Sequence, residues 1–187
     1  MEMKGEYRIF ASREIVWDAL NDPEVLKACL EGCESLDKRS ETEFDALVKT
    51  KVGPIKTTFS CSLELTEIDP PNTYILSGQG NGGASGYAKG SVKVVLAEDE
   101  GATVLGYTVD ASLRGKIGQM GARVIDSVAK KMADEFFNRL RRIVNERTGV
   151  ATETELPIKS RNTVIYRAAL IAAAVGLVIF GIVILTD

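Results

Sequence analysis

Histidine is missing from all 187 residues of this chain. Its absence removes the commonest general base and zinc ligand, and it excludes every nucleophile that an adjacent imidazole would activate. Cysteine is scarce, because only Cys29, Cys33 and Cys61 are present. Three thiols cannot all pair, and they are too few for a closed four-ligand zinc site. We therefore predict no metal site and no catalytic residues, and we interpret the cysteines as small buried residues that stay reduced.

An excess of positive charge is also missing. The chain holds 23 Lys and Arg against 26 Asp and Glu, which gives a net charge of −3. Binding to a phosphate backbone requires a basic excess, so we expect no nucleic-acid partner. Residues 1–4 are charged and carry no apolar run, so the pattern predicts no signal peptide.

What the sequence does contain is a long amphipathic segment, residues 116–145. Apolar residues recur there at intervals of three and four, which places them on one stripe of an α-helix roughly 45 Å long. Asp126, Asp134 and Glu135 fall on the other side, and we interpret these three acids as solvated. An apolar stripe must be buried against another element. Its members are Ile117, Met120, Val124, Ile125, Val128, Met132, Phe136, Leu140 and Ile143.

The sequence before this helix is rich in strand patterns. Residues 5–11 alternate in polarity, and further alternating stretches fill residues 35–113, separated by turns rich in Gly, Pro and Asp. Between them lie two short helical segments, for which we expect Ser12 and Asp22 as N-caps. The predicted fold class is α+β, with a curved antiparallel sheet of about seven strands whose apolar face surrounds the long helix.

A glycine-rich stretch, residues 78–86, has the composition of a nucleotide-binding loop. A phosphate cradle needs a helix directly after it, whereas a strand pattern follows here. Two interpretations remain: a flexible hairpin, or a thinned sheet wall in which Gly78 and Gly90 leave room beneath the helix. Under the second, Gly78→Leu or Gly90→Phe would impair ligand retention more than folding, because the new side chain would fill empty space.

The C-terminal part of the chain has a different character. Residues 148–163 are polar and contain proline, which is typical of a linker. Residues 168–185 carry no charge and no hydrogen-bonding side chain, and with 164–166 they approach the ~20 residues that cross a bilayer. Basic residues flank only the N-terminal side of this segment, which by the positive-inside rule keeps the preceding domain in the cytoplasm. We predict a domain over 1–147, then the linker, then a tail anchor over 164–185 in the cell membrane.

Four segments together resemble the family of the G subunit of carbon monoxide dehydrogenase, within the polyketide-cyclase/START-like (SRPBCC) superfamily of helix-grip folds. They are VWDALNDPEVLKACLEGCE (16–34), KVGPIKTTF (51–59), YILSGQGNGGASGYAKGSVKVVL (74–96) and GKIGQMGARVIDSVAKKMADEFF (115–137). One departure is Glu31, where the family usually has proline. The resemblance implies an accessory protein of a molybdenum-containing dehydrogenase, with a cavity between sheet and helix that holds an apolar ligand.

We expect this cavity to be lined by inward-facing residues of the strands and of the start of the helix. They are Phe59, Cys61, Leu63, Leu76, Gly78, Ala88, Gly90, Val92, Tyr107, Val109, Met120, Gly121, Val124 and Val128.

Three functional hypotheses follow. The first is a non-catalytic, membrane-tethered protein that recruits a molybdenum hydroxylase-type dehydrogenase and binds an apolar molecule such as a respiratory quinone, which would couple carbon monoxide oxidation to the respiratory chain. The second is a cyclase or hydrolase with the cavity as its active site, for which Tyr107 is a candidate acid. The third is a bare membrane anchor without ligand. The missing histidine and the apolar tail favour the first.

Overall fold

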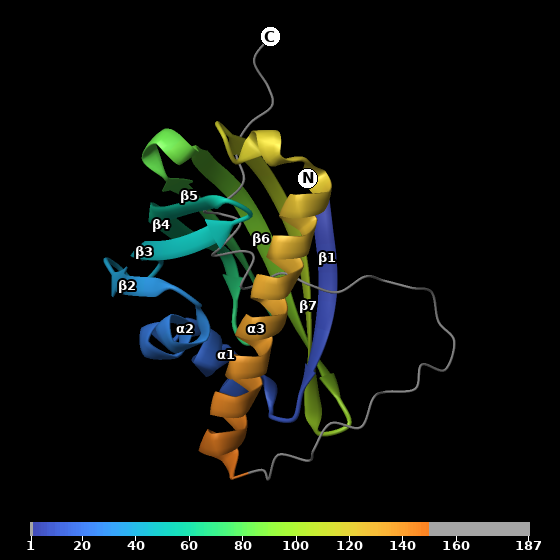
Figure 1. Cartoon of the computed structure of the whole chain (residues 1–187). Coiled ribbons are helices and arrows are strands. Elements are labelled where there is room, and N and C mark those ends of the chain that lie inside the picture. Colours follow the sequence, from blue (N-terminus) through green and yellow to red (C-terminus); the bar gives the residue numbers. More distant parts are fainter. Residues whose placement is uncertain (1, 150–187) are drawn as a thin grey trace.

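The computed structural model describes residues 2–149 and shows the predicted element order of one strand, two short helices, six strands and a long helix. The sheet curves around the long helix α3 (Figure 1). The strands are β1 (Glu2–Ile9), β2 (Cys33–Lys38), β3 (Glu43–Val52), β4 (Ile55–Asp69), β5 (Thr73–Asn81), β6 (Tyr87–Asp99) and β7 (Ala102–Arg114). The helices are α1 (Arg13–Asn21), α2 (Pro23–Cys29) and α3 (Ala122–Thr148), with short 3-10 turns η1 (Gly83–Ser85) and η2 (Gly118–Met120).

The seven described strands form one antiparallel sheet in the order β1-β7-β6-β5-β4-β3-β2. Strands β2 to β7 follow one another as hairpins, and β1 pairs with the free edge of β7, where Glu2 lies opposite Asp110. This arrangement confirms the predicted α+β fold for the part of the chain that the structure describes.

Alternation along the strands separates a buried inner face from a wet outer face. On β4, Phe59 is fully buried, whereas its neighbours Thr58 and Ser60 are exposed. The inner face packs against α3, because only that face offers the apolar surface that the helical stripe requires. The buried stripe of α3 consists of Ile125, Ala129, Ala133, Phe136, Phe137, Leu140 and Val144.

The long helix begins later than predicted and ends later as well, since it spans Ala122–Thr148 instead of 116–145. Gly121 explains the late start, and Gly118 lets the turn before it approach β7 closely. A Cβ at Gly118 would lie 2.7 Å from the carbonyl oxygen of Leu113, and Gly121 has a φ of +83°, which L residues rarely adopt. Met120 therefore lies before the helix, in η2.

The domain has two ends, which Figure 1 shows at the top and at the bottom. The upper end comprises residues 49–58, 81–87 and 112–125, which are the β3–β4 turn, the β5–β6 turn and the junction from β7 into α3. The lower end comprises residues 66–73 and 98–101, which are the β4–β5 and β6–β7 turns, together with α1, α2 and the last turn of α3. The 27 residues of α3 connect the two ends over roughly 40 Å.

Hydrogen bonds join the segments of the upper end to one another. Thr57 Oγ1 donates to the carbonyl oxygen of Gly82 at 3.2 Å, which links β4 to the β5–β6 turn. The amide of Ile117 donates to the carbonyl oxygen of Ser85, also at 3.2 Å, which links that turn to the β7–α3 junction.

At the lower end, α2 is fastened to the end of α3. Asp22 caps α2 as predicted, by accepting from the amides of Glu24 and Val25, and its other oxygen accepts from Arg147 at 2.8 Å. Ser12, the expected cap of α1, makes no capping hydrogen bond to that helix with its side chain.

The chain leaves the described region at Gly149, at the lower end. Thr148, which the prediction placed in the linker, belongs to α3. Residues 150–163 of the predicted linker and the predicted membrane span, 164–185, lie outside the described residues. Within residues 2–149 no helix combines the length and the apolarity needed to cross a bilayer.

Candidate functional site

The inner face of the sheet contains two neighbouring cross-strand rows made of small residues, which we call the small-residue trough. Because these side chains end at a Cβ, at a thiol or at the backbone itself, they leave more room above the sheet than the surrounding Val, Leu and Phe residues do. The first row is Ala46, Cys61, Gly80 and Ala88, and the second is Gly78, Gly90 and Ala111.

The first half of α3 lies on the same side of the interior as this trough. Two contacts place its start there. The amide of Ile117 donates to the carbonyl oxygen of Ser85, and the Met120 side chain lies so close to Gly53 that a Cβ added to this glycine would be 2.5 Å from Met120 Cε. The buried residues of this half of the helix are Ile125, Ala129 and Ala133, so two of the three are also small.

The lower half of the interior is filled by aromatic rings. Tyr7 of β1 and Phe137 of α3 stack with ring centroids 3.9 Å apart, and Tyr107 of β7 lies nearly parallel to Phe137 at 6.0 Å. Phe136 meets Phe137 edge to face at 5.3 Å. Both phenylalanines are fully buried, so this half forms the main packing core.

One polar contact joins β1 to α3 within this half. Tyr7 Oη donates to Asp134 Oδ1 at 2.7 Å. Burial and, after it, this hydrogen bond raise the pKa of Tyr7 well above its ordinary value, so the phenol remains a donor. Asp134 and Glu135 are both half-buried, which corrects the prediction that they are solvated. Helical periodicity could not show the partner of Asp134, because Tyr7 is 127 residues away along the chain.

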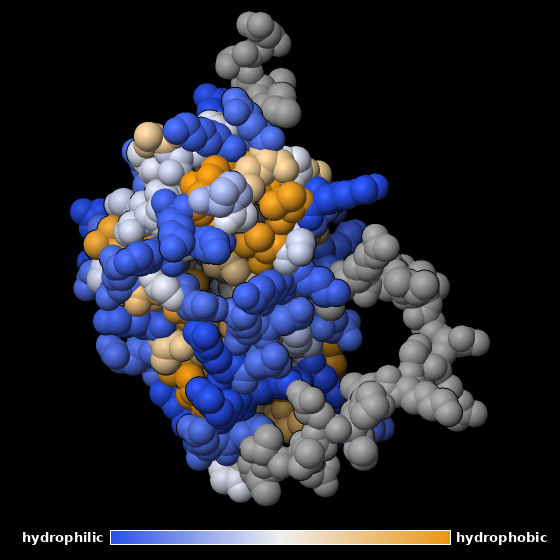
Figure 2. Space-filling model, viewed as in Figure 1, coloured by the Kyte–Doolittle hydropathy of each residue, from blue (hydrophilic) through white to orange (hydrophobic). Residues whose placement is uncertain are grey.

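An apolar patch lies at the upper end, over the start of α3 and the β3–β4 turn (Figure 2). Val124 exposes 38% of its surface there, and Ile55, Met120 and Val128 are half-buried. We call these four residues the apolar rim. The rim lies at the same end of the domain as the small-residue trough.

The predicted cavity residues fall into two groups. Four lie at the rim or beside it, namely Met120, Val124, Val128 and the exposed Gly121. The strand residues are on the inner face and are buried or half-buried: Phe59, Cys61, Leu63, Leu76, Gly78, Ala88, Gly90, Val92, Tyr107 and Val109. The fold thus places the whole set on the inner face of the sheet or at the apolar rim. Contact of these residues with a ligand stays a prediction.

Gly90 has a structural role that the prediction missed. A Cβ at this position would lie 2.6 Å from the carbonyl oxygen of Asp110 and 3.1 Å from Ala111 Cβ, both on β7. A side chain here would collide with the neighbouring strand, so the glycine permits the close approach of β6 and β7. The prediction that Gly90→Phe would merely fill empty space is therefore wrong.

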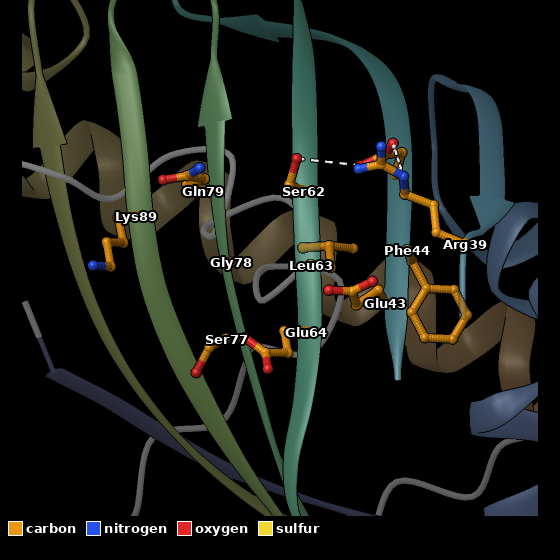
Figure 3. Close-up of a pocket in the computed structure, with 11 residues that line it drawn as sticks. Arg39, Glu43, Phe44, Ser62, Leu63, Glu64, Ser77, Gly78, Gln79 and Lys89 are labelled. Atoms are coloured by element: carbon orange, nitrogen blue, oxygen red, sulfur yellow. Dashed lines mark hydrogen bonds and ion pairs between the residues drawn. The ribbon is translucent and has the colours of Figure 1, made fainter. Parts of the chain in front are cut away.

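Two hollows in the described surface lie on the outer face of the sheet. One, of about 300 Å³, lies over β3 to β6 and is surrounded by polar side chains (Figure 3). Asp45 at its edge is paired with Arg39 at 3.1 Å and accepts from Ser62 at 3.2 Å. The other, of about 350 Å³, lies over β1, β6 and β7 and includes Lys4 and Lys93. Charged side chains border both hollows, and neither hollow lies between the sheet and α3.

The acidic and thiol side chains of the described residues do not form a metal site. Within residues 2–149 no group of three or more Cys, Asp or Glu side chains is arranged to hold a metal ion. Cys29 and Cys61 are buried, and burial raises the pKa of each thiol to about 12, so both stay neutral at physiological pH. Their burial agrees with their interpretation as small core residues, and Cys33 is half-buried.

Sequence reasoning did not find every member of the site. Ala46 and Ala111 complete the small-residue trough, and Ile55 completes the apolar rim. Both alanines lie in alternating stretches of the sequence, but only the register of the sheet shows that they continue rows begun by Cys61 and Gly90. Ile55 gave no signal, because its contact with the site depends on how the β3–β4 turn meets η2.

These features define a class of protein: a START-like, helix-grip domain with an apolar interior. Solved structures share the fold at low identity. The Zhui aromatase/cyclase from Streptomyces sp. R1128 aligns with a TM-score of 0.61 at 14% identity, over 82% of this chain and 99% of that chain. TTHA0849 from Thermus thermophilus aligns with a TM-score of 0.62 at 17% identity, over 79% of this chain and 99% of that chain.

A conserved protein from Geobacillus kaustophilus is more similar, with 28% identity and a TM-score of 0.74 over 78% of this chain and 96% of that chain. Residues 5–145 match the family described as the G subunit of carbon monoxide dehydrogenase (CoxG). Because this match covers most of the sequence, the chain belongs to the CoxG family of carbon monoxide dehydrogenase subunits. No curated protein matches it.

Proposed function

We propose that this chain is a membrane-tethered accessory protein of a carbon monoxide-type dehydrogenase and that it carries an apolar molecule, such as a respiratory quinone, between its sheet and α3. The family bears the name of a subunit of that enzyme. The C-terminal apolar segment would supply the tether, with the domain on the cytoplasmic side. The interior would supply a non-covalent site for a molecule that collects electrons from the dehydrogenase and returns them to the membrane.

One observation carries this proposal: the small-residue trough and the apolar rim occupy the same end of the interior. A flat ring needs a smooth floor, which rows of Gly and Ala provide. An isoprenoid chain needs an apolar path to solvent or lipid, which the rim provides.

The chemistry of the interior favours carriage over catalysis. Cys61, at the floor of the trough, has a neutral thiol that burial makes a poor nucleophile. The Tyr7 phenol is occupied by Asp134. The likeness to an aromatase/cyclase is at 14% identity and supports the fold, so it gives no independent reason for an enzyme.

Two alanines on β6 provide the test. Ala88 is fully buried in the trough, whereas Ala97 is exposed on the outer face of the same strand. The full-length protein is extracted together with its lipids, and bound small molecules are identified by native mass spectrometry and organic extraction. We expect an isoprenoid quinone in the natural protein and in Ala97→Leu, and its loss in Ala88→Leu with little change in Tm.

The opposite outcomes are equally distinct. If the trough is closely packed, Ala88→Leu overpacks the core at a cost of ~1–3 kcal/mol, and Tm falls by several degrees. That result, with no ligand in any of the three proteins, would identify a bare anchor. A polar metabolite that the protein converts would identify a cyclase or hydrolase instead.

A further inference from the structure

Positive charge is concentrated at the upper end of the domain. Its segments 49–58 and 112–125 contain Lys and Arg, and none of its three segments contains Asp or Glu. The nearest acids are Asp126 in α3, and Asp110 and Glu2, which lie opposite each other where β7 and β1 border this end. All of these cations are exposed, and within residues 2–149 none of them forms an ion pair. They are Lys49, Lys51, Lys56, Arg114, Lys116 and Arg123.

The lower end has the opposite character. Its two β-turns, 66–73 and 98–101, contain only acids among their charged residues: Glu67, Asp69, Glu98, Asp99 and Glu100. Nearby cations are held in ion pairs, with Arg8 at 3.1 Å from Asp99 and Arg13 at 3.6 Å from Glu98. An anionic surface therefore attracts the upper end and repels the lower one, although the net charge of the chain is negative.

Partly or largely exposed apolar side chains occur at both ends, but only at the upper end do they stand beside cations that form no ion pair within residues 2–149. Val124 of the apolar rim follows Arg123, and Ile55 precedes Lys56. At the lower end, Ile68 exposes 42% of its surface but lies between two acids. Phe10 exposes 57%, and the Arg8 guanidinium lies over its ring at 5.6 Å. Apolar groups ringed by cations are the pattern of a surface that binds the interface of an anionic membrane.

The length of the chain allows the upper end to reach a membrane that holds the tail. The described chain ends at Gly149, at the lower end and roughly 40 Å from the start of α3. Residues 150–163 separate it from the predicted span, and an extended chain of that length reaches at most roughly 50 Å. An upright domain with its upper end on the bilayer is thus within reach, with little length to spare.

We propose that the upper end is a docking face for anionic lipid, in which the apolar rim enters the headgroup region while the surrounding lysines and arginines contact lipid phosphates. This inference rests on the proposed function, because it assumes the tail anchor and gives the apolar cargo its route between membrane and trough. The rim is then covered by lipid during loading and exposed to water only when the domain lifts away.

Hydrogen–deuterium exchange of the full-length protein, reconstituted into bilayers, tests the face directly. One preparation is phosphatidylcholine alone and the other is phosphatidylcholine mixed with phosphatidylglycerol. We expect slower exchange in residues 49–58 and 112–125 on the anionic bilayers, and no difference in residues 66–73 and 98–101. Salt at about 0.5 M should remove the protection, because it screens charges beyond a few ångströms.

A matched pair of double variants tests the role of charge. Lys51→Glu/Lys56→Glu reverses two exposed cations of the β3–β4 hairpin, and Lys89→Glu/Lys93→Glu reverses two exposed cations of the outer face. Each lysine near an anionic surface contributes a factor of about five, so the hairpin variant should lower the ratio of docked to undocked domain at least ~30-fold. The outer-face variant should keep most of the protection.

Deletion of residues 150–157 tests the geometry without any change to the folded surface. The remaining linker reaches at most roughly 20 Å, so the protein should stay in the membrane while protection of the upper end disappears. The deletion leaves every folded residue unchanged, so a loss of protection in this variant cannot result from misfolding. The docking face requires the same loss in the deletion and in the hairpin variant.

Several results would overturn the docking face. Equal protection on both lipids, or protection that survives the hairpin variant and the linker deletion, would exclude it. Protection that appears only after the dehydrogenase is added would assign the same cations to an acidic protein surface. Quinone content is measured separately, in the natural protein and in Ala88→Leu. A natural protein that docks but carries no quinone would disprove the proposed function and leave the docking face intact.

Discussion

The two halves of the interior are built by the same sheet and the same helix, yet their side chains differ sharply in size. The lower half is filled by the stacked rings of Tyr7, Tyr107 and Phe137. In the upper half, two rows of Gly, Ala and Cys on the sheet face mostly Ala on the helix, and the fully buried ring of Phe59 lies beside these rows. The difference indicates that folding stability is concentrated below, and the proposed function requires the upper half to accept a guest without loss of the fold.

The largest expected effect comes from removing a ring of the lower half. Phe137→Ala should destabilise the domain by about 3–5 kcal/mol, because the ring is fully buried and contacts three other aromatic side chains. Val128→Ala, in the half-buried apolar rim, should cost about 1 kcal/mol or less. Denaturant unfolding followed by circular dichroism measures both. Equal losses would show that the upper half carries as much stability as the lower.

A smaller effect is expected where two strands approach closely. Gly90→Ala should cost about 1–3 kcal/mol, since its Cβ would meet the backbone of β7 at 2.6 Å. Gly106→Ala is the control on β7, because its Cβ would lie 4.0 Å from the carbonyl oxygen of Val95, an ordinary contact. We expect the control to stay within ~1 kcal/mol of the natural protein. If the two variants unfold at the same denaturant concentration, β6 and β7 can separate at no cost.

The fastening of α2 to α3 should contribute less again. Asp22→Ala removes both the cap of α2 and the contact with Arg147, and we expect a loss of about 1–2 kcal/mol. Ser12→Ala should cost only a few tenths of a kcal/mol, because the Ser12 side chain makes no capping hydrogen bond to α1. Thermal unfolding compares the two. A larger effect at Ser12 would contradict the assignment of the caps.

The same contact predicts a dependence on pH. The hydrogen bond from Arg147, supported by the amides of Glu24 and Val25, lowers the pKa of Asp22 below its ordinary value of 3.8. The unfolded chain therefore binds the proton first, so this stabilisation is complete above about pH 4 and is lost as the pH falls through the lower folded pKa. Asp22→Asn should flatten the acid side of a plot of Tm against pH, and an unchanged slope would assign the acid sensitivity to other groups.

Much of the fold could be predicted because it depends on local patterns. Alternation through Phe59 and Cys61 predicted β4 and its inner face, and three-and-four spacing predicted α3. The start of the helix was misplaced because the stripe continues through Ile117 and Met120, whereas Gly121 has a backbone that no α-helix adopts. Composition at the junction was visible, but the conformation of its glycines was not.

The candidate site was harder to predict, because its defining features arise between distant segments. The trough depends on register, which sets Gly78 opposite Gly90. The rim depends on the approach of Met120 to the β3–β4 turn. The segregation of charge emerges only once the fold shows that Lys51, Lys116 and Arg123 share one end, since along the chain they are scattered.

If the tail is the proposed tether, its attachment at the opposite end of α3 from the apolar rim has a kinetic consequence. In a tail-anchored protein the trough sits at the tip of an arm made of linker and domain, roughly 90 Å long when fully extended. A binding site confined to the hemisphere swept by such an arm experiences a nearby partner at an effective concentration on the order of millimolar. A weak, quickly reversible contact with the dehydrogenase would then be saturated, and the cargo could be exchanged many times without a lasting complex.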